Sequence, residues 1–192
     1  NDISFDLNGG SAETLGFSSM NASKNLTVNP DRDSSRSQFV GASVNQKIDS
    51  DLRLGLRANA KNSTTDYDVD NNWSGLKTDT HQFQIKSDTV GAFASRRITE
   101  AWMMDIDVSQ SHFAYEAIKN GTVATSGRYE GQQNVLRWTN AYALQGVTLL
   151  NFGVDRANEK FNQRSVYDVQ RDTQGLFAGL TTQIARWNFQ AN

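Results

Sequence analysis

LRLGLRANAK is the sequence of residues 52–61, and apolar and polar side chains alternate along it with a period of two. Leu52, Leu54, Leu56, Ala58 and Ala60 fall on one side, and Arg53, Arg57, Asn59 and Lys61 fall on the other. A β-strand places successive side chains on opposite faces, whereas a helix would scatter these residues around its axis. The stretch therefore predicts a strand with one apolar and one charged face.

The same alternation recurs along the whole chain. The apolar members of the further strands are Ile3, Phe5 and Leu7; Val40, Ala42, Val44 and Ile48; Trp102, Met104, Ile106 and Val108; Leu136, Trp138 and Tyr142; Leu150, Phe152 and Val154; and Leu176, Ala178, Leu180 and Ile184. We count eight strands, with a ninth beginning near Asn188. We expect about 14 to 18 residues in each strand, against roughly 5 or 6 in soluble sheets.

Short and long connections alternate between these strands. Short turns are expected near residues 49–51, 99–101, 145–146 and 186–187, and long polar loops over residues 15–33, 67–79, 118–127 and 164–172. Short turns on one side and long loops on the other are typical of outer-membrane barrels. Trp102, Trp138, Tyr142 and Trp187 fall near the short-turn ends, where an interfacial aromatic girdle would lie.

Composition supports a barrel with a polar lining. Hydrophobic residues make up 37% of the 192 residues, yet 10% are aromatic, which argues against disorder. The net charge of −2 argues against a nucleic-acid partner, and the absence of cysteine excludes disulfides and thiolate metal sites. No apolar stretch approaches the roughly 20 residues of a transmembrane helix.

These observations predict an all-β fold, an antiparallel transmembrane β-barrel built as a meander of long strands. Lipid would then contact the apolar face, and the charged face would line a wet lumen. One alternative is a soluble all-β binding module such as a sandwich, in which Leu54, Leu56, Phe152 and Leu180 would pack together. Another is a small eight-stranded outer-membrane barrel.

A small barrel enzyme is a further alternative, and it would use one of the two histidines. His112 has Ser109 and Ser111 nearby in the sequence, and His81 follows Asp79. A Ser–His arrangement needs an activated serine beside the imidazole and a third group that orients it. No motif of that kind surrounds the serines, so we expect no catalytic residue.

Several motifs together resemble a known family. SDLRLGLRA at residues 50–58, followed by Thr65-Asp66-Tyr67-Asp68, is similar to the early barrel hairpins of TonB-dependent outer-membrane transporters, with the cobalamin (vitamin B12) transporters nearest. LLNFGVD at residues 149–155 and DTQGLFAGL at residues 172–180 resemble a later hairpin. LGFSS at residues 15–19 resembles the start of the first long loop.

This resemblance implies a bacterial outer-membrane protein that imports a scarce, bulky ligand of the cobalamin or siderophore class. Loops 15–33, 67–79, 118–127 and 164–172 would bind the ligand, and a TonB-type energy-coupling protein would drive its transport. The family's barrel has roughly 22 strands around a plug. Residues 1–192 supply one barrel region of eight to nine strands with no visible plug, so we expect a partial segment of such a barrel.

Asp66, Asp68 and Asp70 form the candidate metal site. Carboxylates at alternate positions can converge on Ca²⁺, which accepts six to eight oxygen ligands in irregular geometry. Asn71 and Lys77 stand where a helical calcium loop would have its glycine and its glutamate. The resemblance implies calcium in the early extracellular loops, with Asp79 and Asp31 or Asp33 as further ligands. A solvated acidic loop is the alternative.

Overall fold

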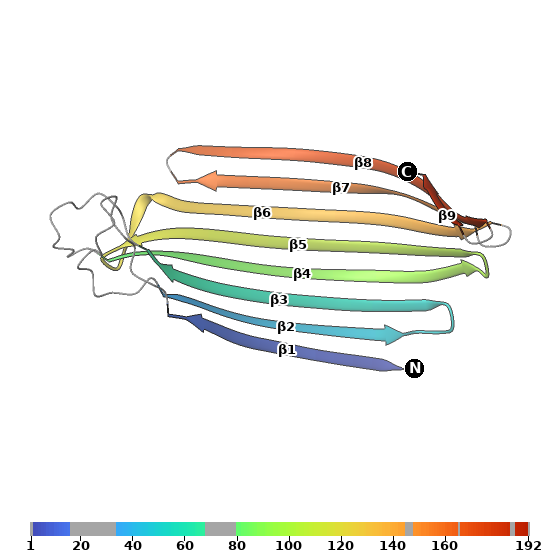
Figure 1. Cartoon of the computed structure of the whole chain (residues 1–192), viewed down its shortest axis with the longest axis horizontal. Helices are drawn as coiled ribbons and strands as arrows, with labels where there is room; N and C mark the ends of the chain where they lie inside the picture. The colour runs from blue at the N-terminus through green and yellow to red at the C-terminus, as the bar shows by residue number, and fades with distance from the viewer. Residues whose placement is uncertain are drawn as a thin grey trace.

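The computed structural model describes residues 2–15, 34–67, 80–144, 148–164, 166–184 and 187–191. These residues form one antiparallel sheet of nine strands that follow one another in chain order (Figure 1). The strands are β1 (Ile3–Thr14), β2 (Ser35–Lys47), β3 (Leu52–Asp66), β4 (His81–Thr99), β5 (Trp102–Lys119), β6 (Thr122–Ala143), β7 (Leu149–Gln163), β8 (Tyr167–Ile184) and β9 (Trp187–Ala191). The predicted all-β meander is confirmed, and it forms an open sheet over the described residues.

The strands are long, as their sequence patterns predict. β1 to β8 have between 12 and 22 residues, and only β9 is short, with five. Continuous pairing carries one parity of residues across the whole sheet: Leu7 pairs with Ala42, Ala42 with Ala58, and Ala58 with Val90. We call this side the belt face and the opposite side, which carries Arg57, the charged face.

The turns that the sequence predicts to be short lie at one end of the sheet, shown on the right in Figure 1. Residues 48–51 join β2 to β3, and residues 100–101 join β4 to β5. In the first turn the Asp49 carboxylate accepts hydrogen bonds from the backbone N–H groups of Asp51 and Leu52, both at 2.7 Å. These bonds favour the ionised carboxylate and lower the pKa of Asp49 from its ordinary value.

Two of the predicted long loops are wrong. Residues 118–127 belong mostly to β5 and β6, which meet at Asn120-Gly121, and residues 167–172 begin β8. Asn120 has a φ of 51° and Gly121 a φ of 74°, the left-handed conformations that a tight two-residue hairpin requires. The Asn-Gly dipeptide is the sequence signal of such a turn, and it outweighs the polarity of the surrounding residues.

The described residues form a single layer without a hydrophobic core. None of their hydrophobic side chains is buried, and the only buried polar side chains among them are Ser95 and Asn140. Leu54, Leu56, Phe152 and Leu180 lie on the same face of this sheet rather than in two layers packed together. In the part of the chain that the structure describes, no helix is both long and apolar enough to cross a membrane.

We predict that Gly121→Ala lowers the free energy of unfolding by about 1 kcal/mol, because a β-carbon disfavours a positive φ. Gly121→Asn is the matched control, since asparagine tolerates this conformation better. Urea denaturation followed by tryptophan fluorescence measures both effects. Equal stability of Gly121→Ala and the unchanged protein would contradict a left-handed conformation at Gly121.

Candidate functional site

A continuous apolar belt crosses the belt face near the short turns. It comprises Ile3, Phe5 and Leu7 and the even-numbered positions of residues 40–44, 54–60, 90–94, 104–108, 136–138, 150–154 and 176–180. Its side chains are exposed or half-buried, and the most exposed, Leu176, is 86% accessible. Strand geometry makes the belt about 20 Å long between Leu54 and Ala60. Soluble monomers rarely expose a patch of this extent.

Aromatic residues border the belt at the short-turn end. Trp102 and Tyr142 are cross-strand partners on the belt face, and Trp138 packs edge-on against Phe152 with ring centroids 6.3 Å apart. The Trp102 indole N–H donates to the Asn140 side-chain oxygen at 3.0 Å. Trp102 and Tyr142 thus border the belt at the predicted end, whereas Trp138 lies within the belt, level with Ile106 and Val154.

The charged face carries an ion pair that spans a strand. Arg57 on β3 reaches across β4 to Asp107 on β5, with 2.7 Å between Nη2 and Oδ1. The path is open because Gly91 lies between them, and a β-carbon there would sit 3.1 Å from Arg57 Nε. Both side chains are partly exposed, so the pair contributes little to stability, roughly 1 kcal/mol or less.

Further towards the loop end, the charged face carries an aromatic ladder. It consists of Tyr67, His81, Phe83, Tyr115, Tyr129, Phe161 and Tyr167. Neighbouring rings lie 5.4 to 6.1 Å apart, centroid to centroid, from the end of β3 to the start of β8. Phe83–Tyr115 and Phe161–Tyr167 are stacked, with interplanar angles of 23° and 21°. The ladder is thus one connected aromatic surface.

A row of polar groups runs parallel to the ladder on the side nearer the short turns. On β7, for example, Glu159 is the next charged-face residue after Phe161 in that direction. Thr89 and Ser111 share a hydrogen bond of 2.9 Å. Glu159 accepts a hydrogen bond from the Gln133 amide and another from Arg171 Nε, each at 2.7 Å. The strand register places Ser111, Gln133, Glu159 and Arg171 side by side on β5 to β8.

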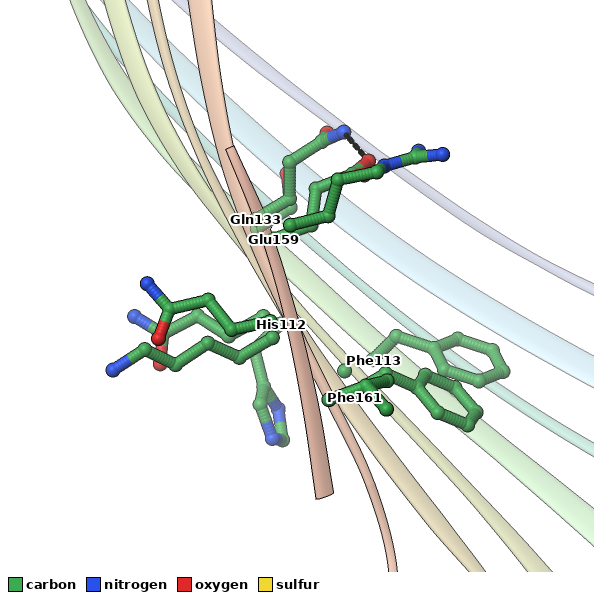
Figure 2. A pocket seen from close by; sticks show the side chains of 12 residues that line it. His112, Phe113, Gln133, Glu159 and Phe161 are labelled. Carbon is green, nitrogen blue, oxygen red and sulfur yellow. Dashed lines mark hydrogen bonds and ion pairs between the residues drawn. The ribbon is translucent and has the colours of Figure 1, made fainter. Parts of the chain in front are cut away.

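A groove of about 560 Å³ lies between the aromatic and polar rows. Figure 2 shows Phe113 and Phe161 on one side of it, Gln133 and Glu159 on the other, and His112 pointing away to the opposite face of the sheet. Gly131 lies between the two phenylalanines, being the cross-strand partner of both. Because Gly131 has no side chain, the space between the rings stays open.

The predicted metal ligands lie mostly outside the described residues. Asp68, Asp70 and Asp79 are outside, as are Asp31 and Asp33 and most of loops 15–33 and 67–79. Asp66 ends β3, where its carboxylate accepts hydrogen bonds from the Ser34 hydroxyl and from the Gln82 amide, the latter at 2.6 Å. Among the described residues no three acidic or histidine side chains gather to hold a metal. Calcium binding stays a prediction.

The two histidines occupy different surroundings. His81 belongs to the aromatic ladder and lies 5.7 Å from the Tyr67 ring. His112 lies on the belt face beyond the apolar belt, with its Nδ1 3.4 Å from Asp88 Oδ1. Ser111 is on the opposite face, bonded to Thr89, so strand alternation separates it from the His112 imidazole.

The sequence interpretation missed both the ladder and the groove. The aromatic residues at 83, 115, 129, 161 and 167 all have the parity of the charged face. That parity was a readable signal, but their alignment depends on the hairpin register, and the register was misjudged where loops 118–127 and 164–172 were expected. A scan against protein-family models finds no match for this chain, and a search of curated proteins finds none either.

We predict that calorimetric titration of the intact protein detects calcium binding that Asp66→Ala/Asp68→Ala abolishes, because carboxylates are the ligands that Ca²⁺ prefers. Asp88→Ala is the matched control, since Asp88 lies on β4 beside His112. An unchanged titration in the double variant would contradict calcium binding by Asp66 and Asp68.

Proposed function

We propose that this chain forms part of the wall of a bacterial outer-membrane β-barrel that imports a scarce, bulky ligand, in the manner of TonB-dependent transporters. The apolar belt would contact outer-membrane lipid, and the charged face would line the lumen. An inner-membrane energy-coupling protein would drive transport through other parts of the barrel. The strands act as scaffold, and no bond in the ligand is made or broken.

The observation that carries this proposal is the exposed belt on a single-layer sheet. A row of apolar side chains that are exposed on β1 to β6 and on β8, and half-buried on β7, needs an apolar solvent. Lipid supplies it, and outer-membrane barrels carry an apolar band about 25 Å tall between aromatic girdles. The Trp102 and Tyr142 pair borders the belt as a girdle would.

The curvature of the strands supports an orientation in which the belt face meets lipid and the charged face lines the lumen. In Figure 2 the strands bend towards the side that carries Phe113 and Phe161. The charged face is therefore on the inside of the bend, and the belt face is on the outside. A barrel wall has this arrangement, with the polar residues facing its lumen.

The assignment to the TonB-dependent class rests on the motifs at residues 50–58, 149–155 and 172–180. Cobalamin and siderophores are the ligands that this resemblance suggests. A small eight-stranded barrel would share the belt and the polar interior, and a soluble module would need another layer to cover the belt.

We predict that Ala58→Arg, at the middle of the belt on β3, lowers the free energy of unfolding in lipid vesicles by about 2–4 kcal/mol, because an arginine would face hydrocarbon. Asn59→Arg places the same side chain on the charged face and should cost less than about 1 kcal/mol. Urea titration of both variants in vesicles makes the comparison.

Two results would contradict the proposal. The first is equal destabilisation by Ala58→Arg and Asn59→Arg. The second is that Trp138, which lies within the belt, and Trp102, which borders it, stay unquenched by lipids that carry bromine on their acyl chains. A soluble module would give the second result but not the first, because an arginine at position 58 would then be buried under the covering layer. The quenching measurement therefore separates a soluble module from a barrel wall.

A further inference from the structure

We infer that the groove between the aromatic ladder and the polar row binds an uncharged oligosaccharide. This inference rests on the proposed function, since it assigns a ligand class to the interior of the barrel. Three features carry it: the shape of the aromatic surface, the chemistry of the polar row and the balance of charge in the groove.

The aromatic surface suits a chain of rings. Aromatic faces carry partial negative charge, and they attract the C–H groups on the flat side of a sugar ring. The ladder offers such faces on five neighbouring strands, with no gap longer than 6.1 Å between centroids. Tyr167 is 41% exposed and the other ladder rings are half-buried, while Phe113, beside the ladder across Gly131, is 38% exposed. An extended ligand could therefore contact several rings at once.

The polar row supplies hydrogen bonds at the edge of the same surface. Gln133, Glu159 and Arg171 present planar amide, carboxylate and guanidinium groups, which together donate and accept. Ring hydroxyls of a sugar both donate and accept, so a sugar lying on Phe113 and Phe161 could satisfy these groups along its edge. Binding grooves commonly combine an apolar wall with a few placed polar groups in this way.

The charge balance argues against charged ligands. On the charged face the groove holds one carboxylate, Glu159, and one guanidinium, Arg171, and these are bonded to each other. Lys160 also lines the groove, but it has the parity of the belt face. An anionic ferric siderophore would therefore find no unpaired cation on the charged face of the groove. Single-stranded nucleic acid also stacks on aromatic rings, but its phosphates need a positively charged groove.

The test measures binding of the full-length protein, held in lipid nanodiscs, to an array of neutral oligosaccharides. Cyanocobalamin and a ferric catecholate siderophore are included in the array. We expect at least one neutral oligosaccharide to bind. Phe161→Ala should weaken that binding by about tenfold, because one stacking surface is lost. Gly131→Val should weaken it similarly by filling the floor of the groove, with every ring retained.

Phe177→Ala is the matched control. Phe177 is also a charged-face phenylalanine, but it lies over Gly153, towards the short turns and outside the groove. It should leave oligosaccharide binding unchanged. Phe161→Tyr, which keeps a ring, should retain binding, and this separates loss of the stacking surface from loss of the fold.

Three results would overturn the inference. They are no binding of any neutral oligosaccharide, binding that Phe161→Ala and Gly131→Val both leave unchanged, and groove-dependent binding of cyanocobalamin or the siderophore alone. Quenching by brominated lipids is recorded on the same nanodiscs. A protein that is quenched by lipid but binds no sugar refutes the ligand class alone, whereas an unquenched protein refutes the barrel.

Discussion

Strict two-residue periodicity in a single-layer sheet is the constraint on which the rest of this structure depends. No second layer buries the apolar side of a strand, so each strand must present its apolar residues on the same face as both of its neighbours. A slip of one residue in the β2–β3 hairpin would move Leu54 and Leu56 to the charged face of β2. Continuous pairing from β1 to β9 prevents this, and it produces one apolar and one charged surface.

Glycine–phenylalanine pairs help to hold that register on the charged face. Phe93 lies over Gly55 on the neighbouring strand, and Phe177 lies over Gly153. In both pairs a β-carbon on the glycine would come within 3 Å of the ring, so the ring takes the place of the missing side chain. Such pairs protect an otherwise bare backbone and oppose a shift of the strands.

Polarity also changes along each strand, and this divides the sheet into two zones. Towards the short turns, the belt face is apolar and the other face carries Arg57, Asp107 and Gly91. Towards the loops, the belt face becomes polar around His112 and Asp88, while the opposite face becomes aromatic. The aromatic ladder therefore lies on the side away from the proposed lipid contact, where a ligand inside a barrel could reach it.

The sequence by itself determined the strands, their parity and which residues share a face, because alternation is a local property of extended chain. Leu52 to Lys61 already showed the belt and the charged face. Only the tertiary structure decided how the strands align, because register depends on turn length and cross-strand pairing. Asn120-Gly121 shortened one expected loop to a hairpin, and the resulting register brought Tyr115 beside Tyr129. The belt was therefore predictable from the sequence, whereas the ladder and its groove exist only through pairing between strands.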